Sequence, residues 1–136
     1  SGRCFEPAWR SVDPLFGVLR AGERVVVSKS AVQANDVIVD IGPETVAAIA
    51  PYIENAATIL WNGPMGKYEG EADGGTQGLA RHIAAASGRS VLGGGDTIAA
   101  IEPLGLLEKF DFVSTGGGAM LQFLESGTLP AIERLD

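Results

Sequence analysis

Short runs of apolar residues alternate with longer mixed segments from residue 37 to the end of the chain. Val37-Ile38-Val39-Asp40-Ile41 is a β-branched run, typical of a strand that is buried on both faces. Pro43 follows, and proline favours the first turn of a helix. We therefore expect a strand at 37–41 and a helix from Pro43 to about Ala56. The same alternation predicts strands at 58–61, 90–92 and 111–114, and helices at 76–86, from Asp96 to Ile101, and after the glycines at 116–118 through Glu125.

Strands that alternate with helices of about ten residues indicate parallel βαβ units. The expected fold class is α/β, with a doubly wound, Rossmann-like parallel sheet that has helices on both faces, or a part of such a sheet. Pro51 is expected to kink or split the first helix. Before residue 37, Arg24–Ser28 predicts a short strand, whereas Phe5 to Gly22 has mixed periodicity and predicts no definite element.

Composition and charge narrow the classes of function. The 136 residues are 46% hydrophobic and 20% charged, which is typical of one globular domain with a real core. Ten basic residues against 17 acidic ones give a net charge of −7, which argues against nucleic acid or an anionic membrane as a partner. No apolar run approaches the ~20 residues that a membrane helix needs. A single cysteine, Cys4, excludes an internal disulfide and a cysteine-based zinc site.

Glycine is over-represented, with 19 residues. Two predicted strands run directly into glycine triplets, at 93–95 and 116–118. The carboxyl ends of parallel strands lie at one edge of a sheet, where ligands bind. Glycine lets an anion approach the backbone, and the amides at a helix N-terminus attract negative charge. We favour a phosphate cradle built by both triplets over the alternative that each triplet simply makes a tight turn.

Three polar side chains near these strand ends are candidate ligand contacts. Asp96 follows the first triplet and would bind phosphates through Mg²⁺, cap its own helix, or do both. Thr97 would offer a hydroxyl and an amide to the same phosphates. Glu69 would accept hydrogen bonds from ribose hydroxyls, although an exposed loop acid is the commoner role for such a residue. Neither common phosphate-binding loop, Gly-x-x-x-x-Gly-Lys-Ser/Thr or Gly-x-Gly-x-x-Gly, is present.

Four motifs together resemble one enzyme family, the phosphoglycerate kinases. Their order and spacing match those of the family, and the resemblance extends over residues 37–135, whereas residues 1–36 match poorly. Phe123-Leu124-Glu125 with Leu129-Pro130 is similar to the family's C-terminus. The four motifs are Asp40-Ile41-Gly42-Pro43, Trp61-Asn62-Gly63-Pro64-Met65-Gly66, Gly93-Gly94-Gly95-Asp96-Thr97 and Ser114-Thr115-Gly116-Gly117-Gly118-Ala119.

The resemblance implies reversible phosphoryl transfer from 1,3-bisphosphoglycerate to Mg-ADP, giving 3-phosphoglycerate and ATP. Residues 37–136 would be the C-terminal part of an incomplete nucleotide-binding domain, and an N-terminal domain absent here would bind phosphoglycerate. The full-length enzyme is expected to be cytoplasmic and monomeric, with no nucleic-acid or membrane partner. The resemblance implies that the nucleoside contacts Asn62, Pro64 and Glu69, with Glu69 on the ribose. It implies that the phosphates contact Gly94, Gly95, Asp96 and Thr97, with Asp96 acting through Mg²⁺. The amides around Gly93 and Gly116 would contact the transferring phosphoryl group.

Some features depart from the family's pattern. Lys67 and Tyr68 stand where the family usually has an aliphatic residue and Phe, and Met120 and Gln122 replace a usual Ser and Glu. Lys67 would alter the nucleoside pocket. The family's phosphate-binding lysines have no counterpart, and neither glycine triplet contains a basic residue.

We therefore expect a C-terminal fragment that is catalytically inert alone, and we assign no function to residues 1–36. Two alternatives remain at this point. The first is a stand-alone nucleotide- or phosphate-binding module without catalysis. The second is an assembly piece whose exposed strand edge pairs with another chain.

Overall fold

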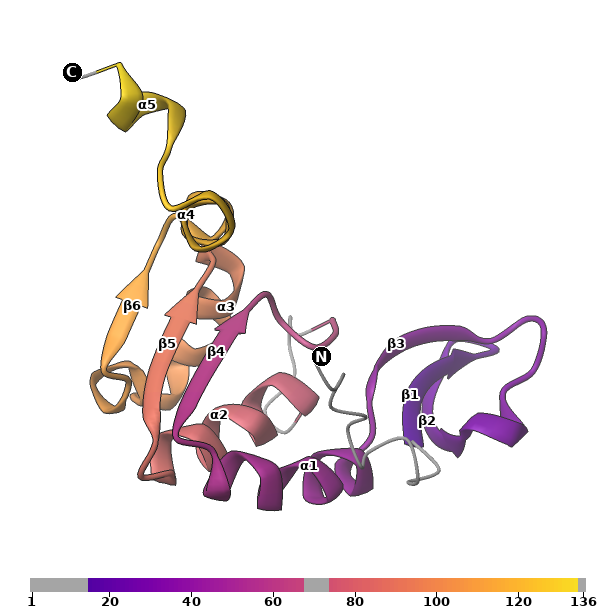
Figure 1. The fold of residues 1–136 in the computed structure, drawn as a ribbon. Helices are drawn as coiled ribbons and strands as arrows, with labels where there is room; N and C mark the ends of the chain where they lie inside the picture. The colour runs from indigo at the N-terminus through magenta and orange to yellow at the C-terminus, as the bar shows by residue number, and fades with distance from the viewer. Residues whose placement is uncertain (1–14, 68–73, 135–136) are drawn as a thin grey trace, which may run out of the picture.

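The computed structural model describes residues 15–67 and 74–134, and its strands form two separate sheets (Figure 1). One sheet is antiparallel with the order β2-β1-β3, and the other is parallel with the order β4-β5-β6. The helix α1 lies between the two sheets along one side of the molecule (Figure 1). The strands are β1 (Leu15–Arg20), β2 (Glu23–Ser28), β3 (Val37–Ile41), β4 (Thr58–Asn62), β5 (Arg89–Gly93) and β6 (Phe112–Ser114).

The helices from α1 to α4 each follow a predicted strand in the chain, much as the sequence predicts. The first three predicted helices begin and end within one residue of the observed ones. The helix predicted after the glycines at 116–118 begins two residues earlier than expected, at Gly117. The helix α1 continues across Pro51, so this proline does not split it, and the alternative that it kinks the helix stays a prediction. The α-helices are α1 (Pro43–Asn55), α2 (Gly75–Ala85), α3 (Gly95–Ile101), α4 (Gly117–Ser126) and α5 (Pro130–Glu133), and the 3-10 helices are η2 (Lys29–Ala31), η3 (Glu102–Leu104) and η4 (Leu107–Lys109).

The parallel sheet carries the main core and confirms the predicted fold class, an α/β fold with a parallel sheet flanked by helices. Trp61 on β4 and Leu92 on β5 lie in register and are both buried. They pack with Leu79 and Ile83 of α2 and with Ile101 of α3 in one hydrophobic cluster. The helix α4 lies across the carboxyl ends of these strands (Figure 1). The core therefore fixes the strand ends at which the glycine motifs begin.

The strand β3 differs from its prediction in both partner and burial. It pairs antiparallel with β1 and is not a strand of the parallel sheet. Val37 and Ile38 are 58% and 53% exposed, so the expectation of a strand buried on both faces is wrong. The β-branched run correctly predicts extended backbone, but β propensity does not choose the partner strand. The strand β1 was not predicted at all.

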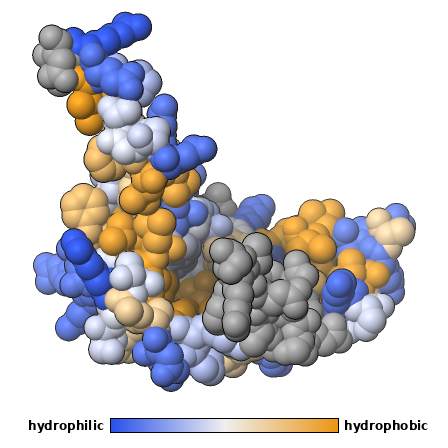
Figure 2. All heavy atoms as spheres, in the orientation of Figure 1, coloured by the Kyte–Doolittle hydropathy of each residue, from blue (hydrophilic) through white to orange (hydrophobic). Residues whose placement is uncertain are grey.

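A second row of apolar side chains lies on the opposite face of the parallel sheet. Leu60, Val91 and Phe112 are in register on three adjacent strands, and residues in register share a face. Leu60 and Phe112 are 49% and 55% exposed. In Figure 2 hydrophobic surface runs along this sheet toward α4. The described residues therefore leave this face of the sheet largely uncovered.

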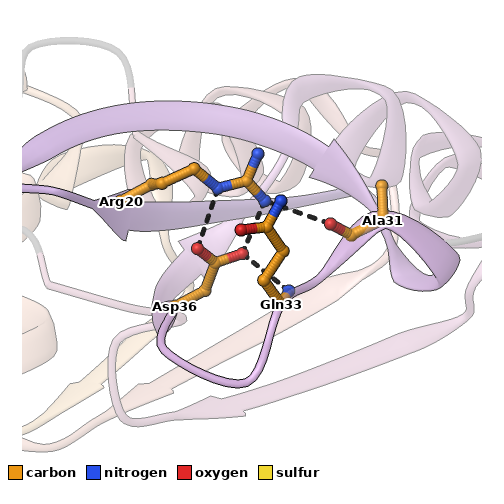
Figure 3. A network of polar contacts seen from close by, with 4 residues as sticks. All are labelled: Arg20, Ala31, Gln33 and Asp36. Atoms are coloured by element: carbon orange, nitrogen blue, oxygen red, sulfur yellow. Dashed lines mark hydrogen bonds and ion pairs between the residues drawn. The ribbon is translucent and has the colours of Figure 1, made fainter.

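An ion pair joins the end of β1 to the loop that precedes β3 (Figure 3). Arg20, the last residue of β1, donates from Nε and Nη2 to the two carboxylate oxygens of Asp36, at 2.9 and 2.7 Å. The same Nη2 donates to the carbonyl of Ala31, and the backbone N–H of Gln33 donates to Asp36 at 2.8 Å. The loop between β2 and β3 is thereby tied to β1.

Candidate functional site

The two glycine triplets lie side by side at the carboxyl end of the parallel sheet. The N–H of Gly94 donates to the carbonyl of Ser114, two residues before the second triplet, at 3.0 Å, and a Cβ on Gly117 would lie 2.7 Å from the backbone nitrogen of Gly94. Gly94 has a φ of +95°, a conformation that side chains with a Cβ rarely adopt. The two strand-to-helix turns and the loop after β4 line an open cavity of about 420 Å³. Its lining comprises Asn62, Gly63, Pro64, Gly94, Gly95, Asp96, Thr97, Thr115, Gly116, Gly117, Gly118 and Ala119.

Asn62, the last residue of β4, shows why several of these positions are glycine. A Cβ on Gly117 would collide with the Asn62 side-chain oxygen, and a Cβ on Gly93 or Gly94 would lie 2.9 or 3.1 Å from it. A Cβ on Gly95 or Gly118 would meet nothing within 4 Å. Gly93, Gly94 and Gly117 thus make room for protein atoms, whereas Gly95 and Gly118 face the open cavity.

The polar groups of the cavity suit an anion that brings its own metal ion. Asp96, in the first turn of α3, is the one carboxylate among the lining residues that the structure describes. The described residues contain no cluster of three or more His, Cys, Asp or Glu side chains that would hold a metal ion. They also place no Lys or Arg in the lining. A Mg²⁺ ion at this site would depend on one carboxylate, water and oxygens of a phosphate ligand, which is a common arrangement for Mg²⁺.

Most of the candidate residues predicted from sequence come together here. Asn62, Pro64, Gly94, Gly95, Asp96, Thr97 and Gly116 all line the cavity. Gly93 is buried beneath it and is not part of the lining. Glu69, together with Tyr68, lies outside the residues that the structure describes. Thr115 and Ala119 were not singled out, although both stand within the motif that begins at Ser114.

Thr97 has a contact that its sequence position does not reveal. Its side chain is fully buried, and its Oγ1 accepts a hydrogen bond from the backbone N–H of Gly63 at 2.9 Å. A second buried threonine, Thr76 in the first turn of α2, likewise accepts the N–H of Met65 at 2.9 Å. Thr76 does not line the cavity, and sequence reasoning did not single it out, because nothing in its own motif points to the loop after β4.

Comparison with known proteins identifies the family. The family model described as phosphoglycerate kinase matches residues 12–127. The chain belongs to the phosphoglycerate kinase family. A phosphoglycerate kinase of Vibrio campbellii is 49% identical over 108 residues, which are 79% of this chain and 28% of that protein. This match confirms the resemblance that the four motifs indicate.

Solved phosphoglycerate kinase structures share the fold. The enzyme from Coxiella burnetii matches with a TM-score of 0.78 and 41% identity, over 89% of this chain and 32% of the solved one. The enzyme from Pyrococcus horikoshii matches with a TM-score of 0.75 and 36% identity, over 88% and 30%. The chain therefore spans less than a third of the length of these relatives. Within the described residues, no helix is both long and apolar enough to cross a membrane.

Proposed function

We propose that this chain provides the nucleotide-phosphate and magnesium-binding loops of a phosphoglycerate kinase. The complete enzyme would transfer a phosphoryl group from 1,3-bisphosphoglycerate to Mg-ADP, giving 3-phosphoglycerate and ATP. The observation that carries the proposal is the convergence of both glycine triplets and Asn62 on one cavity beside Asp96. Phosphoglycerate would bind to a domain outside this chain, and the complete enzyme would be a cytoplasmic monomer.

Each part of the cavity has a distinct role in this proposal. Asn62 and Pro64 would contact the nucleoside, with Glu69 on the ribose. The backbone amides of Gly95 and Thr97 would hold the phosphates, since the first amides of a helix have no partner within it. Gly94, whose own N–H donates to the carbonyl of Ser114, would contribute by letting the phosphates approach the backbone without a Cβ in the way. The amides around Gly93 and Gly116 would stabilise the transferring phosphoryl group, which needs positioning and charge neutralisation more than covalent chemistry.

Asp96 would bind the magnesium ion that accompanies the nucleotide. The fit is favourable because Asp96 is exposed at the mouth of the cavity and lies beside Gly95, where the space is open. Magnesium would neutralise phosphate charge that no basic residue of the described lining can neutralise. The carboxylate would therefore act through the metal ion, because a direct contact with a phosphate would be repulsive.

Calorimetric titration with ADP tests this assignment. We expect weak binding that requires Mg²⁺ and that Asp96→Ala abolishes. Glu102→Ala is the matched control, because Glu102 is an exposed acid just beyond the other end of α3 and lies outside the cavity lining. No heat at millimolar ADP, or equal binding by both variants, would contradict the proposal.

A second candidate function is nucleotide or phosphate binding without catalysis. It is favoured by the absence of Lys and Arg from the described lining, since phosphoryl transfer uses cations to stabilise its transition state. The two candidates share the titration result and differ in whether activity appears when the rest of a phosphoglycerate kinase is supplied.

A further inference from the structure

The loop from Asn62 to Lys67, which carries Asn62 and Pro64 into the cavity, is anchored at every second residue. The N–H of Gly63 donates to Thr97 Oγ1 on α3, and the N–H of Met65 donates to Thr76 Oγ1 on α2, both at 2.9 Å. The N–H of Lys67 donates to the carbonyl of Val39 on β3 at 2.7 Å. Three different elements therefore hold one short loop.

The threonine hydroxyl on α2 serves the loop and does not cap its own helix. Thr76 is 1% exposed and is the second residue of α2, whose N-cap is Gly74, with no side-chain capping bond. A buried hydroxyl pairs with some group, because an unpaired one costs free energy. Here the partner is the N–H of Met65, eleven residues away. Thr76 therefore joins α2 to the loop.

The start of α2 is itself held by the antiparallel sheet. The N–H of Gly75 donates to Oδ2 of Asp40 at 2.8 Å, and Arg24 of β2 pairs with the same oxygen at 2.9 Å. Asp40 is 4% exposed. Gly66 packs on it so closely that a Cβ there would lie 2.5 Å from Oδ1. A continuous series of polar contacts thus runs from Arg24 through Asp40 to the start of α2, and from Thr76 of α2 to the loop from Asn62 to Lys67.

We propose that Thr76 is a positioning residue for the nucleotide site, and that Asp40 and Arg24 support it from the antiparallel sheet. The inference rests on the proposed function and adds residues that line no part of the cavity. Losing the Thr76 acceptor would leave the N–H of Met65 unpaired and loosen the loop between its two remaining anchors. The loop would then be ordered only when nucleotide binds, and affinity would fall.

The deciding experiment compares Thr76→Val, which keeps the shape and removes the acceptor, with Thr76→Ser, which keeps the acceptor. Amide hydrogen exchange is measured at Met65 and at Leu92 of the core, together with Mg-ADP titration. Thr76→Val should speed exchange at Met65 about tenfold, leave Leu92 protected, and weaken Mg-ADP binding about three- to tenfold. Thr76→Ser should keep the parent chain's exchange rate at Met65 and its affinity for Mg-ADP.

The outcomes separate this inference from the proposed function. If Thr76→Val leaves exchange at Met65 unchanged, or lowers protection equally at Leu92, Thr76 has no specific role in the loop and the inference fails. Faster exchange at Met65 with unchanged affinity would also overturn it. If the parent chain binds no Mg-ADP, the proposed function of this chain fails, and exchange at Met65 still decides whether Thr76 anchors the loop.

Asp40→Asn is the second variant and tests the series of contacts from the sheet. Asparagine keeps an oxygen for the N–H of Gly75 but removes the charge that faces Arg24. Exchange at Met65 should rise less than in Thr76→Val, and Mg-ADP affinity should fall less than threefold. A larger rise in exchange at Leu92 than at Met65 would show that Asp40 supports the fold in general, and it would contradict a specific role for Asp40 in holding the loop.

Discussion

Asp36 illustrates how one residue can make the antiparallel sheet sensitive to acid. Hydrogen bonds from Arg20, and then from the backbone of Gln33, lower the pKa of Asp36 from 3.8 to about 2. Because the pKa is lower in the folded state, the contribution to stability is fully present above about pH 4. It is lost as the pH falls through the folded pKa. The acid limb of the stability profile should therefore contain a component from this one carboxylate.

Asp36→Asn should remove that component. The free energy of unfolding of the parent chain should fall more steeply between about pH 5 and pH 2.5 than that of the variant. Urea unfolding at several pH values measures both slopes. Glu54→Gln, at an exposed position on α1, serves as the control and should keep the parent's slope. Parallel profiles for the parent chain and Asp36→Asn would contradict this account of the ion pair.

At the scale of elements, α4 depends on two neighbouring glycines in different ways. A Cβ on Gly117 would collide with Asn62 and lie 2.7 Å from the backbone nitrogen of Gly94, whereas a Cβ on Gly118 would meet nothing within 4 Å. Gly117→Ala should therefore force α4 away from the first triplet and cost about 1–3 kcal/mol of stability. Gly118→Ala should be neutral or stabilise by up to about 1 kcal/mol, because alanine favours a helix.

Thermal unfolding of the two alanine variants tests this difference. The substitutions are the same, both lie in the first turn of α4, and both remove a glycine from a helix. Equal effects on the free energy of unfolding would show that the close approach of α4 to the strand ends does not constrain residue 117. The expected order, with Gly117→Ala the less stable, would confirm that the glycine there is required by packing.

The sequence predicts elements better than it predicts their partners. The helices and the parallel strands have local signals, so their positions follow from pattern alone. The hairpin of β1 and β2 was missed because its turn is Ala21-Gly22, with φ values of +52° and +86°. Hairpin turns with positive φ at both central residues usually have Asn, Asp or Gly at the first of them, and Ala21 at that position gives no such signal. Because β1 was not predicted, the antiparallel pairing of β3 with it could not be predicted either.

The candidate site shows the same division between local and distant information. The glycine triplets and Asp96 are recognisable because each motif is continuous in the sequence. The anchoring of Gly63 by Thr97 and of Met65 by Thr76 joins residues 34 and 11 positions apart. A hydroxyl at the start of a helix has several possible partners, so only the fold reveals which one it uses.

At the scale of the whole molecule, the described cavity lacks one component that the proposed phosphoryl transfer requires, a cationic side chain. The chain has a cavity with open glycine backbone and one carboxylate, but the described lining supplies no cation. The row of Leu60, Val91 and Phe112 leaves an apolar face of the sheet uncovered by described residues. The chain also spans only 28% of the Vibrio campbellii relative. These features are the ones expected if the proposed activity needs residues beyond those that line the described cavity.

We therefore expect no phosphoglycerate kinase activity from this chain alone, and activity once a polypeptide with the remaining N-terminal part of the Vibrio campbellii relative is added. ATP formation from ADP and 1,3-bisphosphoglycerate is the measurement. In the mixture, Asp96→Ala should lower the rate more than about tenfold, because the metal ion loses its protein ligand. Glu102→Ala should leave the rate unchanged. Activity of the chain alone would contradict the expected need for outside cations, and a tight but inactive complex would favour nucleotide binding without catalysis.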